Sequence, residues 1–327
     1  MYRPTNPTIT PTPFQPIPLT PSFIPTAYLT PELLQSPPAL SSEIFPALAN
    51  TWGNFAGPSA YPAIAIPPPI GKINQPANQV NILIMGSDQR LFDGGYRTDV
   101  ILLLTLNVDK GTASLTSFPR DLFVYIPGWT MERINTAHAH GGFELTAQMM
   151  EYNFGVRPDH WVLINFGGFV SIVNVLGGIN VQVASTLSDT RDGYGYYTVP
   201  AGSFHMNGDT ALWYVRSRGT SNDFDRTRRQ QEVLQAIFYQ VISLDGITRA
   251  PELYGQYEYT MSTDMTMNEI LPLLPLASQL AISNDIYRYA IGNEHISPWT
   301  NPNTGAQVLL PIRASVLSIM EQALSKP

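Results

Sequence analysis

The chain has 327 residues, of which 44% are hydrophobic and 13% are charged, and its formal net charge at pH 7 is −7. The hydrophobic share is enough for a packed core, whereas so few charges argue against a coiled coil or a charge-driven disordered protein, and the acidic balance argues against a protein that coats nucleic acid. Because the chain has no cysteine, disulfide scaffolds, thiolate zinc sites and cysteine nucleophiles are excluded.

Proline dominates the N-terminal part of the chain, since 18 of the 29 prolines lie within the first 80 residues. Proline fixes the backbone angle φ and lacks an N–H donor, so this stretch cannot build long helices or central strands. We therefore expect residues 1–78 to be an extended, largely disordered linker or stalk and residues 79–327 to be the folded domain. A short apolar turn at residues 51–55 is the one exception that we expect.

No segment has the length and composition of a transmembrane helix, which needs about 18 or more consecutive apolar residues. A secretory signal is not visible either, because no basic region followed by an apolar run stands at the N-terminus. The chain therefore starts after an anchor, has its true start further upstream, or is soluble, and the sequence leaves these alternatives open.

The first predicted strands follow the proline-rich stretch and are short runs of β-branched residues and leucine. Such runs are typical of strands that are covered on both faces. Asp109, Lys110 and Gly111 predict a tight turn between the second and the third strand. The expected strands are residues 80–85, 100–106, 112–118, 160–166, 179–183 and 286–291.

Helical segments alternate with these strands, which indicates a layered α/β domain. Val233, Ile237, Val241 and Leu244 recur at helical spacing in the longest of them. The expected helices are residues 143–153, 168–176, a helix that begins at 209, 226–244, 267–282 (interrupted by Pro272 and Pro275) and 312–324. Residues 245–327 are interpreted as the end of the same domain, with a small appended subdomain as the alternative.

Arginine and aspartate stand together at the ends of the first three predicted strands, where ligands usually bind in layered α/β sheets. The residues are Asp88 and Arg90, Arg97 and Asp99, and Arg120 and Asp121. Carboxylates bind hard divalent cations, and arginine matches the oxygens of phosphate. A local salt bridge explains any single pair, but three pairs at three strand ends favour a site for a diphosphate and a cation.

A second group of arginines is denser, because five fall within 14 residues: Arg216, Arg218, Arg226, Arg228 and Arg229. Arg216 and Arg218 share a face if their segment is extended. Arg226 and Arg229 share a face near the start of a helix, where the helix dipole favours anions, and Arg228 is expected to be solvated. Without interleaved aromatic residues or a wider basic surface, this group does not indicate a nucleic-acid site.

His138 and His140 form a further candidate, because two histidines one residue apart can bind a metal from a strand. No other histidine or cysteine pattern accompanies them, so we interpret the pair as structural.

The segment from Asn81 to Leu244 resembles the LytR-CpsA-Psr (LCP) domain of bacterial cell-envelope proteins. The matching motifs stand in the order of the family: Ile82–Arg90, Arg97–Asp99, Ser117–Asp121, Arg133–Asn135 with Ala137, Gly141–Gly142, Leu176–Ile179, Leu212–Arg218 and Asp223–Gln231. Arg133 stands where the family commonly has lysine, and Asp225 stands where it often has a small residue.

The resemblance implies a three-layer α/β/α sandwich with a mixed central sheet and a long apolar groove for a polyprenyl chain. It implies a magnesium-dependent phosphotransferase that moves a glycopolymer from a polyprenyl-diphosphate carrier to peptidoglycan by forming a phosphodiester. Such a protein acts outside the cytoplasm, in the cell envelope, where its lipid substrate brings it to the membrane surface, and it has no nucleic-acid partner. The alternatives are a polyprenyl-diphosphate hydrolase and a non-catalytic binder or regulator of lipid-linked polymer.

The resemblance also implies roles for the candidate site residues by motif position. Asp88 and Asp99 correspond to the ligands of Mg²⁺. The diphosphate is assigned to Arg97, Arg120, Arg216, Arg218 and Arg226, with Arg90, Asp121, Arg229 and Gln230 in support. Asp99, Arg120 and Asp121 are the candidate catalytic residues, and either Asp99 or Asp121 is the general base.

Overall fold

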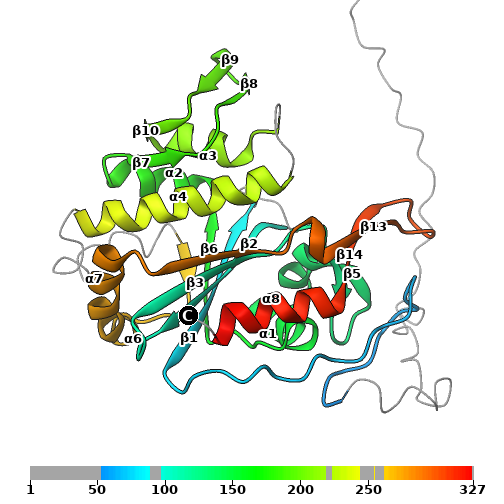
Figure 1. Ribbon diagram of the computed structural model, residues 1–327. Helices are drawn as coiled ribbons and strands as arrows, with labels where there is room; N and C mark the ends of the chain where they lie inside the picture. Colours follow the sequence, from blue (N-terminus) through cyan, green and yellow to red (C-terminus); the bar gives the residue numbers. More distant parts are fainter. Residues whose placement is uncertain (1–52, 89–96, 219–222, 244–253, 255–260, 326–327) are drawn as a thin grey trace, which may run out of the picture. The chain divides into compact units, whose positions relative to one another are not determined.

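A mixed six-stranded sheet organises the computed structural model, which describes residues 53–88, 97–218, 223–243, 254 and 261–325 (Figure 1). The strands in spatial order are β11 (Met261–Thr263), β6 (His160–Asn165), β1 (Gln79–Ser87), β2 (Thr98–Asn107), β3 (Thr112–Ser117) and β12 (Ile286–Ala290). The pairs β1–β2, β2–β3 and β6–β11 are antiparallel, and β1–β6 and β3–β12 are parallel. The mixed sheet that the resemblance implies is therefore confirmed.

Helices cover both faces of this sheet, because the central strands bury side chains in both directions. On one face, Leu83 and Leu103 pack in a core with α1 (Ala137–Phe154) and α8 (Arg313–Ser325). On the other face, Ile82 and Leu106 pack with α7 (Leu274–Ser283) and with partly buried side chains of α4 (Asp223–Ser243) and α6 (Met267–Ile270). Alternate residues of a strand point to opposite faces, so the continuous apolar runs produce three layers.

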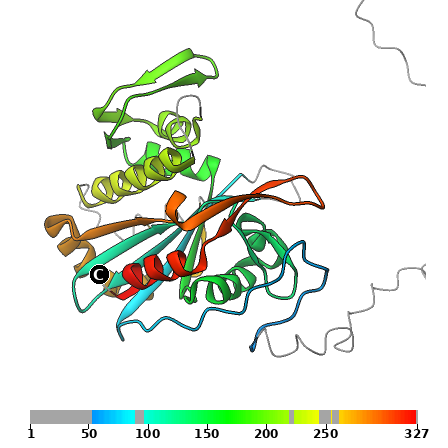
Figure 2. The ribbon, with the colours of Figure 1, turned by 45° about the vertical axis from the view of Figure 1, so that its right-hand side comes forward.

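A further layer of structure lies beside the sheet and forms its own core (Figures 1 and 2). It consists of α2 (Phe166–Val175), β7 (Ile179–Val183), β8 (Leu187–Arg191), β9 (Gly195–Val199), β10 (Gly202–Met206), α3 (Gly208–Arg216) and α4. Pairing of β7 with β10 and of β8 with β9 produces two small antiparallel sheets. In Figure 1 the β8–β9 hairpin stands at the top, beyond the helices.

Two further antiparallel pairs complete the strands of the described residues. They are β4 (Phe123–Tyr125) with β5 (Met131–Arg133), and β13 (Ile296–Thr300) with β14 (Gln307–Pro311). Short 3₁₀ turns occupy Ile134–Thr136, Leu271–Leu273 and Asn293–His295. The second of these turns separates α6 from α7, so the expected interruption of helix 267–282 by its two prolines is confirmed.

Residues 53–78, which the sequence analysis assigns to the proline-rich stretch, lie along the domain and hydrogen-bond to it. The amide of Ile70 donates to the carbonyl of Tyr152 (2.8 Å), and the hydroxyl of Tyr152 donates to the carbonyl of Pro67 (2.7 Å). Ile73 is buried in the sheet–helix core. Contacts with the folded domain therefore begin before the expected boundary at residue 79, and the described residues from 53 onward belong to one compact unit. Residues 1–52 lie outside the described residues.

The end of α1 shows why a glycine is needed where this segment passes. Gly155 ends α1 at φ +69, and its carbonyl accepts a hydrogen bond of 2.9 Å from the amide of Ile73. A Cβ atom at this position would lie 2.8 Å from the carbonyl oxygen of Gly71. Glycine therefore serves both the left-handed end of the helix and the close approach of the segment.

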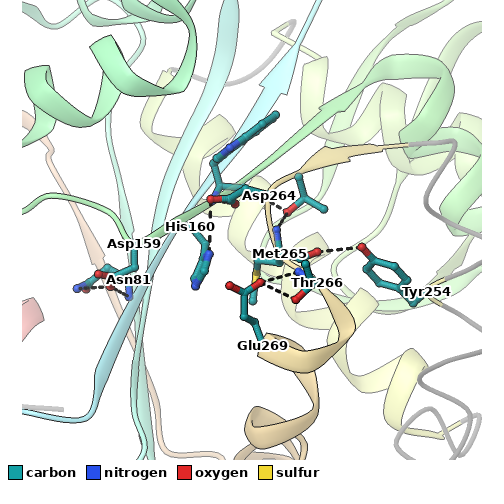
Figure 3. A network of polar contacts seen from close by, with 10 residues as sticks. Asn81, Asp159, His160, Tyr254, Asp264, Met265, Thr266 and Glu269 are labelled. Carbon is teal, nitrogen blue, oxygen red and sulfur yellow. Dashed lines mark hydrogen bonds and ion pairs between the residues drawn. The ribbon is translucent and has the colours of Figure 1, made fainter.

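A polar network ties the start of the parallel pair β1–β6 to the segment after β11 (Figure 3). Asp159 Oδ2 accepts a hydrogen bond from the amide of Asn81 (2.8 Å), and Asp264 Oδ1 accepts one from the amide of Trp161 (2.9 Å). His160 Nδ1 lies 3.5 Å from Asp264 Oδ2. Since these carboxylates bind backbone amides, the network fixes strand positions. None of its residues lines the cavity described next.

Within the described residues, no helix combines the length and the apolar composition needed to cross a membrane.

Candidate active site

A cavity of about 730 Å³ opens between the central sheet and the layer of α2, α3 and α4. Its lining falls into two chemical classes, apolar side chains and a set of arginines and aspartates. The apolar class comes from β1, β2, β6, α2, α3 and α4 and includes Ile84, Val100, Ile164, Phe169, Leu212 and Leu234. The charged class includes Asp99, Arg120, Arg216, Arg218 and Arg226.

Helix α4 shows how the two classes are arranged, because its lining residues change in character along its length. Arg226 and Gln230 come first, and Val233, Leu234 and Ile237 follow. At ~1.5 Å of rise per residue, the step from Arg226 to Ile237 covers roughly 16 Å. The cavity therefore passes from a charged part to an apolar part along one helix.

Arg120 is held at the charged part by two carboxylates. Its Nη1 lies 2.9 Å from Asp99 Oδ2, and its Nε lies 3.4 Å from Asp121 Oδ2. Asp121 also contacts Arg133, whose Nη1 lies 3.3 Å from Asp121 Oδ1. Asp99 and Arg120 line the cavity, whereas Asp121 and Arg133 do not. These half-exposed pairs fix side-chain orientation more than they add stability.

Asp88 has a different environment from Asp99, although Asp88 directly follows β1 and Asp99 lies at the start of β2, the strand that pairs with β1. Asp88 Oδ1 accepts a hydrogen bond from the amide of Arg97 (3.0 Å), and the amide of Asp88 donates to the carbonyl of Arg97 (3.3 Å). These bonds close the base of the loop that joins β1 to β2. Neither Asp88 nor Arg97 lines the cavity. Arg90, the remaining candidate in this loop, lies outside the described residues.

Arg216 and Arg218 both line the cavity, although the segment that carries them is not extended. Arg216 is the last residue of α3, and its guanidinium carbon lies 4.3 Å from the centroid of the Phe166 ring. Arg218 follows the helix, and its amide donates to Asp189 Oδ2 (2.9 Å), which also accepts from the hydroxyl of Ser217. The end of the helix, not a strand, brings the two guanidinium groups to one cavity.

Arg226 and Arg229 lie in the first turns of α4, as expected. Arg226 lines the cavity, and so does the supporting candidate Gln230, but Arg229 does not. Arg229 is 1% exposed, and its Nη2 donates a hydrogen bond of 2.6 Å to the carbonyl of Ser217. Burial lowers the pKa of Arg229. Arg229 therefore acts on the site through the chain segment between Arg216 and Arg218.

Arg228 does not line the cavity, and its side chain is 32% exposed, so it is partly solvated while it also has partners. It forms ion pairs with Glu232 and, at 3.7 Å, with Asp225, and its Nη2 donates to Ser185 Oγ (3.0 Å). The carboxylate of Asp225 therefore has a partner on its own helix. Glu232 in turn accepts a hydrogen bond from the hydroxyl of Tyr214 (2.7 Å), and burial is the main reason that the pKa of Tyr214 is raised.

His138 and His140 lie on α1 rather than on a strand, and each contacts a different tryptophan. His138 is buried, which lowers its pKa, and its ring lies 6.1 Å from that of Trp161. His140 stacks on Trp129 at 4.3 Å and lies 3.3 Å from Glu132 Oε2. Across the part of the chain that the structure describes, no three histidine, cysteine, aspartate or glutamate side chains are grouped to hold a metal.

The sequence analysis missed the β8–β9 hairpin, whose residues Asp189–Asp192 and Tyr194 line the same cavity. Asp192, Gly193 and Tyr194 form its turn, and Gly193 has φ +78. An Asp-Gly pair between two alternating segments is the usual signal for such a turn.

Comparisons with known proteins agree with this fold. A family model described as "LytR_cpsA_psr family" matches residues 64–303. The chain is 34% identical over 193 residues to the polyisoprenyl-teichoic acid–peptidoglycan teichoic acid transferase TagU of Bacillus subtilis, a match that covers 58% of this chain and 61% of TagU. It is 31% identical over 207 residues to TagT of the same organism, which bears the same transferase name, over 61% of this chain and 64% of TagT. The matches thus span less than two thirds of either relative.

Solved structures are similar over a larger share of their length. The TM-score is 0.65 to the crystal structure of B. subtilis TagV, at 27% identity, with 75% of this chain and 95% of TagV covered. It is 0.62 to TagT bound to LIIa-WTA, at 26% identity, with 76% and 90% covered.

Proposed function

The chain belongs to the LytR-CpsA-Psr family, and we propose that it transfers a glycopolymer from a polyprenyl-diphosphate carrier to peptidoglycan by forming a phosphodiester bond. The relatives TagU and TagT bear the name of transferases that join polyisoprenyl-linked teichoic acid to peptidoglycan. One observation carries the proposal: a single cavity combines a set of arginines with a long apolar lining.

The apolar lining suits the polyprenyl chain of such a carrier. Phe169, Leu234 and Ile237 offer hydrocarbon surface beyond the charged residues. Each methylene that leaves water contributes ~0.8 kcal/mol, so a chain of isoprene units binds well without any polar contact.

Arg120, Arg216, Arg218 and Arg226 suit the diphosphate, because all four residues line one cavity. A guanidinium pairs with two phosphate oxygens at once and keeps its charge at any physiological pH. Charge that develops on the leaving phosphate during transfer is stabilised by such fixed donors.

Magnesium is part of the proposal, with Asp99 and Asp88 as its protein ligands. Asp99 presents a carboxylate to the cavity, and Asp88 follows the strand that pairs with the strand of Asp99. A pair of carboxylates is enough for Mg²⁺, which usually binds one or two protein carboxylates. Water and substrate phosphate oxygens then complete its coordination shell. When bound, Mg²⁺ would neutralise phosphate oxygens and favour departure of the polyprenyl phosphate.

Asp99 and Asp121 have different roles in the proposed transfer step. A hydroxyl of the acceptor sugar forms a bond to the phosphorus that carries the glycan, and the bridging P–O bond breaks to release polyprenyl phosphate. The proton of the hydroxyl passes to Asp99, which lines the cavity. Asp121 lies outside the lining and pairs with Arg120 and Arg133, so we assign it the role of holding Arg120.

We place this reaction outside the cytoplasm, at the membrane surface, since the lipid carrier and the peptidoglycan acceptor meet there. The alternative hydrolase would use the same phosphate contacts with water as the acceptor, so product analysis has to separate the two reactions.

The test follows a polyprenyl-diphosphate glycan by mass spectrometry, with Mg²⁺ or a chelator and with peptidoglycan fragments. The expected product is the acceptor joined to glycan phosphate, formed only with Mg²⁺. Replacing Arg216 or Arg218 by lysine should reduce donor affinity roughly tenfold, because the paired donors are lost. Arg288→Lys, on an exposed position of β12, is the matched control. Equal activity in all three variants would contradict the site, and full activity with the chelator would remove magnesium from it.

A further inference from the structure

The β8–β9 hairpin stands beyond α3 and α4 (Figures 1 and 2), and its residues Arg191 and Tyr194 line the cavity beside the other charged residues. We propose that Tyr194, Arg191 and Trp213 form a carbohydrate subsite, in which a pyranose ring stacks on Tyr194 and its oxygens accept hydrogen bonds from Arg191. The inference rests on the proposed function, because it names where the glycan next to the diphosphate is held.

Arg191 is the strongest sign of a ligand at this place. It is only 9% exposed and lines the cavity, and its guanidinium carbon lies 4.1 Å from the Tyr194 ring centroid and 4.7 Å from that of Tyr197. None of its nitrogens is among the fully buried unpaired atoms of the described residues, although the residue as a whole is almost covered. Its N–H groups are therefore reachable from the cavity and are suited to ligand oxygens.

Tyr194 is an exposed ring that its neighbours hold in place. It is 65% exposed, although it lines the cavity, and its ring meets that of Tyr197 edge-on at 5.8 Å. Arg191 covers part of one side of it. An aromatic side chain that is already ordered loses little conformational entropy when a ligand stacks on it.

Trp213 connects this aromatic face to the arginines of the site. Its ring meets that of Tyr197 at 5.1 Å and 89°, and its Nε1 donates to the carbonyl of Thr190 (3.0 Å). Asp189, the central residue of β8, accepts hydrogen bonds from the hydroxyl of Ser217 and from the amide of Arg218. The hairpin is therefore fixed to the segment that carries the arginines, and a sugar on Tyr194 would adjoin the diphosphate.

The mixture of groups points to a sugar rather than to lipid. A pyranose ring has a flat face of C–H groups, which pairs with the face of an aromatic ring, and a rim of hydroxyl groups that need polar partners. Asp189 and Asp192 line the cavity beside Arg191 and supply acceptors for those hydroxyls. A polyprenyl chain offers no polar group to Arg191 or Asp192, whereas a sugar does. The sugar comes either from the lipid-linked donor or from the peptidoglycan acceptor.

The hairpin itself provides a matched control in Tyr196. Tyr196 pairs with Thr190 across the ladder and therefore faces away from Tyr197, since successive residues of a strand alternate between faces. It is 72% exposed and does not line the cavity. Tyr196→Ala removes the same amount of aromatic surface as Tyr194→Ala without touching the proposed subsite.

The first test titrates the full chain with a tetramer of N-acetylglucosamine by calorimetry. Tyr194→Ala should weaken binding by about fivefold or more, whereas Tyr194→Phe and Tyr196→Ala should bind like the unaltered chain. Arg191→Lys should also weaken binding, because one ammonium cannot replace the paired donors. Circular dichroism and thermal unfolding check that each variant is folded. Equal affinity of the Tyr194→Ala and Tyr196→Ala variants would overturn the subsite.

The second test separates the two sources of the sugar and separates the subsite from the proposed function. A raised KM of Tyr194→Ala for the lipid-linked glycan places the donor sugar on the hairpin, and a raised KM for the peptidoglycan fragment places the acceptor there. Transfer with both KM values unchanged would overturn the subsite alone. Saccharide binding that depends on Tyr194, in a chain without any transferase activity, would support the subsite and refute the proposed function.

Discussion

Arg229 donates a hydrogen bond of 2.6 Å to the carbonyl oxygen of Ser217, and through it a fully buried side chain of α4 holds the residue between two arginines of the cavity. The ring of Tyr214 lies beneath the same guanidinium, 5.6 Å from its carbon. The positions of Arg216 and Arg218 therefore depend on a residue that does not itself line the cavity.

Replacing Arg229 by alanine should lower the free energy of unfolding by about 1.5–3 kcal/mol, the usual range for losing a hydrogen bond from a charged group. The same variant should bind donor diphosphate more weakly, because Ser217 is no longer held. Urea unfolding and donor titration measure the two effects. Arg288→Ala, on the exposed side of β12, should change stability by no more than about 0.5 kcal/mol. A stable Arg229→Ala variant with normal donor affinity would contradict this role.

Asp99 and Asp121 should differ in their effect on turnover. Asp99→Asn should reduce kcat roughly 10²-fold or more, because it removes both the proposed general base and a proposed ligand of Mg²⁺. Asp121→Asn should act mainly on donor affinity, because Asp121 holds Arg120 and lies outside the cavity lining. Single-turnover kinetics distinguish the two effects. A larger loss of kcat in Asp121→Asn would reverse the assignment of the base.

The apolar lining should determine the preference for long lipids. Leu234→Gln keeps the size of the side chain but places an amide in the apolar part of the cavity. Affinity for a long polyprenyl diphosphate should fall about fivefold or more, because the amide must lose its water. Affinity for a sugar diphosphate without lipid should stay unchanged. Calorimetry with both ligands checks the prediction, and equal losses for the two ligands would show that the lipid lies elsewhere.

Stability should fall below neutral pH through His138, whose burial lowers its pKa from the ordinary value of 6.5. As the pH falls through 6.5, the unfolded chain takes up a proton that the folded chain resists, so the unfolding free energy decreases until the folded pKa is also passed. Unfolding at pH 7.5 and pH 5 should show this loss. His138→Gln should reduce the loss, whereas replacement of the exposed His205 should leave it unchanged. The same loss in both variants would contradict the prediction.

The central strands were predictable because both of their faces are covered. Continuous runs such as residues 80–85 and 100–106 contain few polar interruptions, and these runs became β1 and β2. The arginines of the cavity were predictable as a group for a similar reason, since charges are scarce in this chain and stand at the ends of elements.

The β8–β9 hairpin was less visible, because its residues are polar or aromatic and its buried face rests on α3 rather than on the sheet. The contacts of the proline-rich segment with the domain were not predictable from its composition either. The carbonyls of Pro67 and Pro68 accept hydrogen bonds from Tyr152 and Arg313. Proline retains its carbonyl acceptor, so a stretch without regular structure can still bind along a domain. The different roles of Asp99 and Asp121 could be proposed only from the cavity lining, because in the sequence both aspartates stand close to an arginine.

The most direct measurement of the central claim is the fate of oxygen when the reaction is run in water enriched in ¹⁸O. Transfer to peptidoglycan predicts acceptor–glycan phosphodiester and polyprenyl phosphate without ¹⁸O, because the acceptor hydroxyl supplies the new oxygen. Incorporation of one ¹⁸O into released glycan phosphate, with no phosphodiester to the acceptor, would contradict the transferase and identify a hydrolase.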